Sequence, residues 1–155
     1  MTRYIGPGAD EGDARSFEDA FNMLCGDLLG RGLHRAVFRC RLRDGWVVKV
    51  EAGEQRRFAN VLEYEFWQQV QYQEDVARWL APCGELSPDG RLLLQRRADP
   101  LPLGFKFPPK MPKFLTDLKR SNFGLWKGNL VCIDYAFTIS EASLDMRRAQ
   151  WRRES

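Results

Sequence analysis

Histidine and long hydrophobic runs are nearly absent from this sequence. A single histidine, His34, occurs in 155 residues, which nearly excludes Ser-His or Cys-His catalysis and a multi-histidine zinc site. No apolar run approaches the roughly 20 residues that cross a bilayer, and the N-terminus has no apolar signal core behind its few charges. The sequence therefore predicts a soluble, cytoplasmic protein that does not contact a membrane.

Paired cysteine motifs and a strong net charge are also lacking. The four cysteines form no Cys-x-x-Cys pair, and we expect them to be reduced thiols in the core. A net charge of +3 is too small to favour nucleic acid by bulk electrostatics. The arginines of the C-terminal tail are typical of phosphate or carboxylate recognition, or more commonly of a solvated helix end. The tail arginines are Arg147, Arg148, Arg152 and Arg153. Nucleic acid is therefore not an expected partner.

The chain is long enough for one hydrophobic core. With 44% hydrophobic residues, it should form a single domain or two small lobes that share one crevice. We expect a flexible lead-in at 1–15, an N-terminal lobe at 16–97, a Pro-rich joint at 98–113 and a reduced C-terminal lobe at 114–155.

The first hundred residues predict helices packed on an antiparallel sheet. Ser16 is a candidate N-cap for a helix whose apolar residues include Phe17 and Phe21. Alternation of period two predicts strands at 36–42 and 46–51, with a third strand through Leu28 and Leu29. A further helix is predicted at 56–71, and short strands near 84–86 and 91–95. The fold class is therefore α+β, with five antiparallel strands in the N-terminal lobe.

Proline marks a change of composition at Pro100. Five prolines in thirteen residues predict an extended surface segment, in which Phe105 and Phe107 are unusual and suggest either a cover for the second lobe or a binding surface. A hairpin follows around Lys127-Gly128-Asn129, and the tail from Glu141 to Arg153 is helix-prone. The second lobe is too small to fold alone, so it should borrow apolar surface from the N-terminal lobe, from a second copy of the chain or from a partner. We expect self-association or a protein partner.

A group of polar residues follows the Pro-rich segment. Asp117, Lys119 and Asn122 lie close together in the sequence, and the run Leu130–Ile133 leads to Asp134. This spacing suits a phosphoryl-transfer site, in which carboxylate and amide oxygens hold Mg²⁺ and a lysine offsets phosphate charge. The alternative is an ordinary solvated turn.

These motifs together resemble those of protein kinases. Residues 30–37 resemble the glycine-rich loop, Val47-Val48-Lys49-Val50 the strand that carries the phosphate-binding lysine, Asp117–Asn122 the catalytic loop, and Ile133-Asp134-Tyr135-Ala136 the metal-binding Asp-Phe-Gly segment. The match covers roughly residues 28–137. It is most similar to the small kinase-like proteins of bacteriophages and bacteria, and it implies a kinase-like fold with a strongly reduced C-terminal lobe.

The resemblance implies a role for each matched residue. Gly30, Gly32 and Val37 would contact ATP, and Lys49 would hold its α and β phosphates. Asp117 would orient the acceptor hydroxyl, and Lys119 would steady the transferring phosphoryl group. ATP and Mg²⁺ are the implied ligands, and the residues implied to coordinate the metal are Asn122 and Asp134.

The partner of Lys49 should be a glutamate of the helix at 56–71. Glu63 is followed four residues later by Trp67, which indicates an inward face, whereas Glu65 is followed by Gln69, which indicates a solvated face. We therefore expect a Lys49–Glu63 ion pair close to Asp134.

The sequence departs from the kinase pattern at several positions. Arg35 replaces the third glycine of the loop, and Leu115 and Thr116 stand where kinases have histidine and arginine. Only 21 residues follow Asp134, too few for the substrate-binding helices of a kinase. Two functions remain open: an ATP-dependent phosphotransferase acting on a protein or small-molecule hydroxyl, and a non-catalytic, pseudokinase-type module that binds a partner protein.

Overall fold

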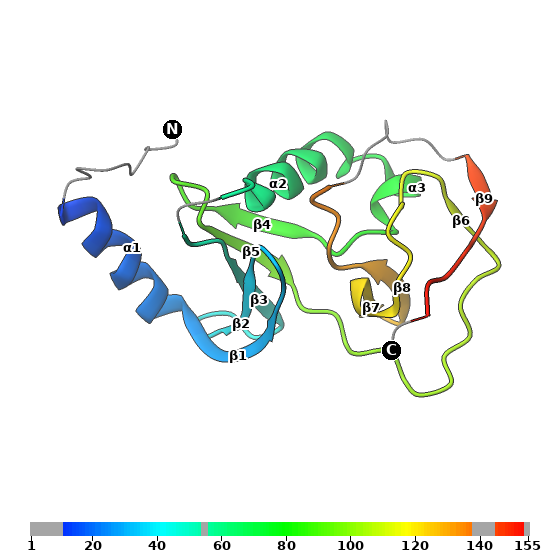
Figure 1. Ribbon diagram of the computed structural model, residues 1–155, viewed down its shortest axis with the longest axis horizontal. Coiled ribbons are helices and arrows are strands. Elements are labelled where there is room, and N and C mark those ends of the chain that lie inside the picture. The colour runs from blue at the N-terminus through cyan, green and yellow to red at the C-terminus, as the bar shows by residue number, and fades with distance from the viewer. Residues whose placement is uncertain (1–10, 54–55, 138–144, 154–155) are drawn as a thin grey trace.

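An antiparallel sheet of five strands organises the N-terminal part of the chain (Figure 1). The structure is a computed structural model that describes residues 11–53, 56–137 and 145–153. The strand order is β1-β2-β3-β5-β4, so the expected α+β class with five antiparallel strands is confirmed. The strands are β1 (Cys25–Arg31), β2 (Ala36–Cys40), β3 (Trp46–Val50), β4 (Cys83–Leu86) and β5 (Leu92–Arg96).

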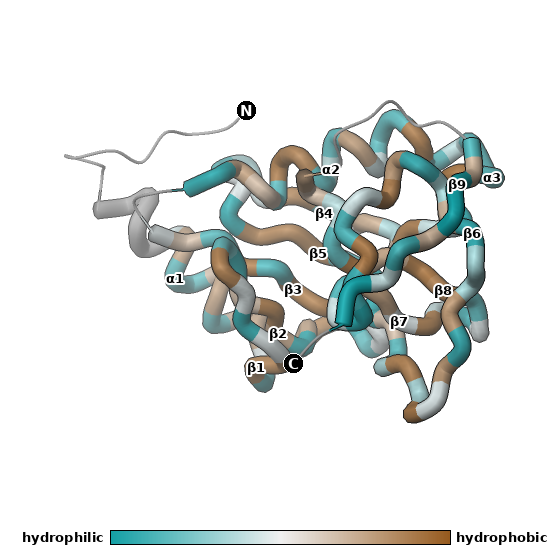
Figure 2. Tube along the Cα trace, turned by 45° about the vertical axis from the view of Figure 1, so that its right-hand side comes forward, coloured by the Kyte–Doolittle hydropathy of each residue, from teal (hydrophilic) through white to brown (hydrophobic). Residues whose placement is uncertain are grey.

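One face of this sheet packs against helix α1 (Glu11–Leu24). Phe38 in β2 and Val48 in β3 are direct cross-strand partners, and Val48 in turn pairs with Leu94 in β5. Paired residues of an antiparallel sheet point to the same face, so these side chains form one apolar surface. The ring of Phe21 in α1 meets that of Phe38 edge to face, with centroids 5.2 Å apart. Figure 2 shows β3 and β5 as largely hydrophobic segments inside the molecule.

The opposite face packs against helix α2 (Ala59–Val70), which short helix α3 (Glu74–Ala77) follows. Leu93 of β5 is fully buried against Trp67 and Val70 of α2. The buried Glu51 carboxylate accepts hydrogen bonds from the backbone N–H groups at the start of α2, 2.8 Å from Ala59 N and 3.2 Å from Asn60 N. An anionic acceptor at this end stabilises a helix because the first N–H groups have no partner within it.

Two small strand pairs form the C-terminal part. The hairpin of β7 (Phe123–Trp126) and β8 (Asn129–Cys132) follows a 3-10 turn at Arg120–Asn122, and β6 (Lys110–Pro112) pairs with β9 (Met146–Arg148). Cys132 N–H donates to Trp79 O at 2.7 Å, which ties the hairpin to the segment before β4. Both parts of the chain therefore share one core, which includes Leu93, Phe114, Leu118 and Phe123.

The first helix differs from its prediction. It is present from Glu11, so Ser16 lies within the helix rather than at its N-cap, and residues 11–15 are not a flexible lead-in. Residues 1–10 lie outside the described part of the chain. No proline separates Glu11 from Ser16, so nothing in this segment forces the helix to begin at Ser16. Leu28, which continues the helical spacing, belongs to β1.

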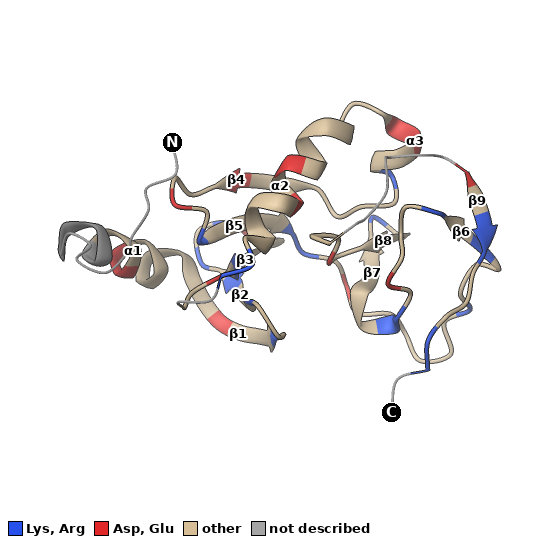
Figure 3. Cartoon of the chain, turned by 45° about the horizontal axis from the view of Figure 1, so that its top comes forward, with Lys and Arg blue, Asp and Glu red and all other residues tan. Residues whose placement is uncertain are grey.

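The C-terminal tail was predicted as a helix, and this is wrong for Met146–Arg148. These residues form β9 and pair with the Pro-rich segment, while Ala149 N–H donates to Pro109 O at 2.8 Å. Tertiary pairing thus overrides the local helix propensity of the tail. The first part of the predicted helix, residues 141–144, lies outside the described residues. Figure 3 shows β9 as a basic strand at the edge of the molecule.

The Pro-rich segment runs extended, as expected, but it is not only a surface segment. Met111 in β6 is fully buried. Phe107 stacks on Trp151 with centroids 4.0 Å apart, and Trp151 also contacts Phe123 and donates from Nε1 to Pro108 O at 3.1 Å. The two aromatic segments singled out in the sequence therefore pack on each other, with Phe105, Phe107 and Trp151 half-buried.

Membrane spanning receives no support from the helices. None of those in the described residues combines the length and the apolar character that crossing a bilayer requires.

Removing the Trp151 ring should destabilise the fold. Trp151→Ala should lower the free energy of unfolding by about 2 kcal/mol, because a half-buried aromatic loses part of the 3–5 kcal/mol typical of full burial. Urea denaturation measures this change. Tyr72→Ala is the control, because Tyr72 is 89% exposed and its loss should change little. Equal effects of the two substitutions would show that residues 145–153 do not pack as described.

Candidate functional site

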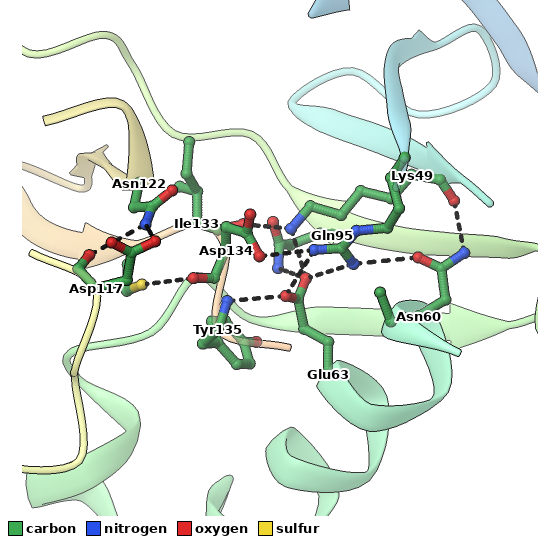
Figure 4. A network of polar contacts seen from close by, with 12 residues as sticks. Lys49, Asn60, Glu63, Gln95, Asp117, Asn122, Ile133, Asp134 and Tyr135 are labelled. Atoms are coloured by element: carbon green, nitrogen blue, oxygen red, sulfur yellow. Dashed lines mark hydrogen bonds and ion pairs between the residues drawn. The ribbon is translucent and has the colours of Figure 1, made fainter. Parts of the chain in front are cut away.

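A buried ion pair joins β3 to α2. Lys49 Nζ lies 2.5 Å from Glu63 Oε1, and both residues are almost inaccessible to solvent (Figure 4). Glu65, the alternative partner, is exposed. The expected Lys49–Glu63 ion pair is confirmed.

Glu63 accepts hydrogen bonds from four separate parts of the chain. Besides Lys49, Gln95 Nε2 of β5 donates to Oε1 at 3.0 Å, and the backbone N–H of Tyr135 donates to Oε2 at 2.9 Å. Arg35 donates to both carboxylate oxygens, at 3.3 and 3.1 Å. Arg35 in turn binds the side chains of Asn60 and Asp134. We call the six side chains together the Glu63 cluster: Arg35, Lys49, Asn60, Glu63, Gln95 and Asp134.

These contacts determine the ionisation of the cluster. Burial by itself raises the pKa of Glu63, but the charges of Arg35 and Lys49 outweigh it and lower the pKa from 4.5 to about 2. Burial likewise lowers the pKa of Arg35, and the carboxylates of Glu63 and Asp134 reverse this and raise it above its ordinary value. Glu63 and Arg35 are therefore both charged at neutral pH and pair with each other.

Arg35 occupies the centre of this cluster and was not predicted as a site residue. It directly precedes β2, and its Nη2 donates to Asp134 Oδ1 at 2.9 Å. Its Nη1 also donates to Asn60 Oδ1 at 3.2 Å. The sequence showed only that an arginine replaces the third glycine of the loop; the partners of its guanidinium come from residues 25 to 99 positions away.

The segment from Ile133 to Tyr135 lies directly against the cluster. Lys49 Nζ also donates to the backbone oxygen of Ile133, and the buried Tyr135 hydroxyl donates to Ala81 O at 2.7 Å. The side chain of Asp134 remains about half-exposed beside Arg35. The structure thus brings Lys49, Glu63 and Asp134 together, as their spacing in the resemblance implied.

Buried leucines anchor the loop that carries Asp117, and the charged side chains of this loop point towards solvent. Leu115 and Leu118 are buried in the core. Asn122 Nδ2 donates to the Asp117 side chain at 2.9 Å and to its backbone oxygen at 3.1 Å. Lys119 Nζ lies 3.9 Å from Asp117 Oδ2. Asp117, Lys119 and Asn122 are therefore close neighbours.

Arg152 from the tail also binds this loop. Its backbone N–H donates to Leu118 O at 2.8 Å, and its guanidinium pairs with Asp117 Oδ1. No sequence signal connected Arg152 with Asp117, because the two residues lie 35 positions apart in the chain. The result is that each predicted catalytic or metal-binding carboxylate, Asp117 and Asp134, is paired with an arginine.

The predicted nucleotide-contacting residues of the sheet lie in one row. Gly30 pairs with Val37, and Val37 pairs with Lys49, across β1, β2 and β3. Gly32 N–H donates to Arg35 O at 2.8 Å and closes the turn that leads to β2. A Cβ at Gly30 would meet no atom within 4 Å, so the space beside this strand is open.

A small cavity lies between the two carboxylates. Its volume is ≈ 80 Å³, and its lining includes Asp117, Asp134, Leu115 and Phe123. Small-molecule pockets usually measure roughly 300–1,000 Å³, so this cavity is too small to enclose a ligand of nucleotide size.

Cysteine chemistry is not favoured at this site. Burial raises the pKa of both Cys83 and Cys132 to about 12, so neither thiol is ionised at neutral pH. All four cysteines are buried and free, as expected for reduced core thiols.

Metal ligands are few around the Glu63 cluster. Asn122 and Asp134 are the residues that would hold Mg²⁺ by resemblance, but Asp134 accepts from Arg35 and the Asn122 amide nitrogen donates to Asp117. Among the described residues there is no group of three or more His, Cys, Asp or Glu side chains that could hold a metal ion.

Comparison with known proteins gives no family assignment: no protein-family model matches this sequence, and no curated protein matches it. The functional interpretation therefore rests on the residues and contacts described above.

Glu63 should contribute strongly to stability. Glu63→Gln should lower the free energy of unfolding by about 3 kcal/mol, because it leaves two buried cations without their carboxylate. Glu65→Gln is the matched control on the same helix and should change little, since Glu65 is exposed. Chemical denaturation of both variants at pH 7 tests this, and equal stabilities would contradict the described role of Glu63.

The contribution of Glu63 should also depend on pH. Its pKa is lowered from 4.5 to about 2 by folding, so the unfolded chain binds the proton more tightly. The stabilisation is therefore complete above about pH 5 and is lost as pH falls towards 2. We expect the difference in unfolding free energy between wild type and Glu63→Gln to narrow over this range. A difference that stays constant from pH 6 to pH 3 would show that the pKa of Glu63 is not lowered.

Proposed function

We propose that this chain is a kinase-like nucleotide-binding module that holds ATP beside Lys49 and does not transfer its phosphoryl group. The observation that carries this proposal is the buried Lys49–Glu63 ion pair beside the segment that bears Asp134. In protein kinases a lysine of the third strand contacts the nucleotide phosphates and pairs with a glutamate of the next helix.

The arrangement of the elements supports the same proposal. Lys49 is on β3, Glu63 is on the helix that follows, and Asp134 follows the hairpin β7–β8. The row of Gly30, Val37 and Lys49 leaves open space beside β1. An ordinary salt bridge would need Lys49 and Glu63 alone. Here the loop before β2, the strand β5 and the segment after Asp134 also donate hydrogen bonds to the Glu63 carboxylate.

The contacts of Asp117 argue against phosphoryl transfer. A carboxylate that orients an acceptor hydroxyl needs a free oxygen close to the reacting group. In this chain one Asp117 oxygen pairs with Arg152 and the other accepts from Asn122.

ATP should stabilise the folded protein. At about 100 times its Kd, a ligand that binds only the native state adds roughly 2.7 kcal/mol, which corresponds to about 5–10 °C in melting temperature for a chain of this size. Thermal melts with millimolar ATP and Mg²⁺ measure the shift. Lys49→Met should abolish it, while Lys106→Met, which removes an exposed lysine of the Pro-rich segment, should retain it. No shift in the wild type would exclude the proposal.

Self-association through the Pro-rich segment is a second candidate function. Phe105, Phe107 and Trp151 stay half-buried, and Leu103 beside them is 99% exposed. Apolar side chains gathered in this way favour a protein contact.

Sedimentation velocity at micromolar concentration tests this candidate. We expect a dimer that Leu103→Asp dissociates and Tyr72→Asp leaves intact, because Tyr72 is also exposed but lies between α2 and α3 and not in the Pro-rich segment. A monomer at every concentration would rule out self-association.

A further inference from the structure

We propose that the Glu63 cluster binds the nucleotide polyphosphate without a divalent metal ion, and that the Arg35 guanidinium supplies the positive charge beside Lys49. This inference rests on the proposed nucleotide-binding function. It identifies the group that would contact the phosphates and the form in which the nucleotide would bind.

Arg35 lies in a socket built from buried side chains. Asn60 is fully buried, and its Nδ2 donates to the backbone oxygens of Lys49 and Arg91 at 2.9 and 3.0 Å. These two bonds fix the orientation of the amide and direct its Oδ1 towards Arg35. A buried carbonyl oxygen needs a donor, so Asn60 and Glu63 together define a position for a guanidinium.

Two cations share one carboxylate in this cluster. Lys49 Nζ and Arg35 Nη1 both donate to Oε1 of Glu63, at 2.5 and 3.3 Å. The three groups carry one surplus positive charge, which Asp134 balances from the half-exposed side. A phosphate can replace the Asp134 carboxylate as the partner of Arg35, because guanidinium groups bind phosphate oxygens through paired N–H donors.

The arrangement fits Mg²⁺ less well than it fits a guanidinium. In protein kinases the aspartate at the position of Asp134 holds the metal ion. Here Asp134 Oδ1 accepts from the guanidinium of Arg35, whose Nη2 lies 2.9 Å away. A divalent cation on Asp134 would lie beside this fixed charge and be repelled by it. Arg35 thus stands where the resemblance places the metal.

The loop position of Arg35 agrees with contact to phosphates. In protein kinases the glycine-rich loop covers the phosphates of the nucleotide. Arg35 ends the corresponding turn, which the bond from Gly32 N–H to Arg35 O closes. Its side chain reaches from this turn to Asp134, the residue that directly follows Ile133, whose backbone oxygen accepts from Lys49 Nζ.

Calorimetric titration of the full chain with ATP, in EDTA and in Mg²⁺, tests the inference. We expect binding in EDTA with a Kd within about threefold of that in Mg²⁺. Arg35→Ala should weaken binding in EDTA by about tenfold or more, and Arg35→Lys by less, because lysine keeps the charge but loses the paired donors. Arg43→Ala is the control, since Arg43 pairs with Glu85 on the surface.

Asp134→Asn gives the sharpest comparison. If Asp134 competes with phosphate for Arg35, removing its charge should tighten ATP binding in EDTA. Binding that requires Mg²⁺ and is lost in Asp134→Asn would overturn the inference and leave the proposed nucleotide site intact. No binding under either condition would overturn both. Should Arg35→Ala fail to fold, the wild type and Asp134→Asn still decide between these outcomes.

Discussion

The buried carboxylate of Glu63 is the group on which the arrangement of this protein depends. A carboxylate without solvent would normally take up a proton, but here donors from the loop before β2, from β3, from β5 and from the segment after β8 converge on it. The donors are Arg35, Lys49, Gln95 and the backbone of Tyr135. One charged group thereby fixes the position of α2 against the sheet and of the C-terminal hairpin against both.

This single group also explains why two cations lie so close together. Lys49 and Arg35 would repel each other without the carboxylate between them, and Asp134 completes the charge balance from the solvent side. The internal pairing leaves the cluster neutral while keeping two cationic groups side by side. Binding of an anion would then require only the displacement of Asp134, whereas the buried socket of Arg35 and Lys49 stays in place.

Much of the fold could be predicted from local patterns, because period-two and helical spacing are properties of neighbouring residues. The strands of the antiparallel sheet, the helix that carries Glu63 and the hairpin before Asp134 follow from such patterns. β9 could not be predicted, since its pairing with β6 is a contact between segments about 36 positions apart that overrides a helical preference. The partners of Arg35 and Arg152 were missed for the same reason: a replaced glycine or a tail arginine carries no sign of the carboxylate it meets.

The central claim is that Glu63 holds Lys49 and Arg35 as a pair of cations for a polyphosphate. A crystal structure of the protein with ATP in the presence of a chelator tests it most directly. The account predicts phosphate oxygens within hydrogen-bonding distance of both Lys49 Nζ and the Arg35 guanidinium, with Glu63 still bound to both. Phosphates bound elsewhere, or an Arg35 side chain turned away from Glu63 and from the nucleotide, would contradict it.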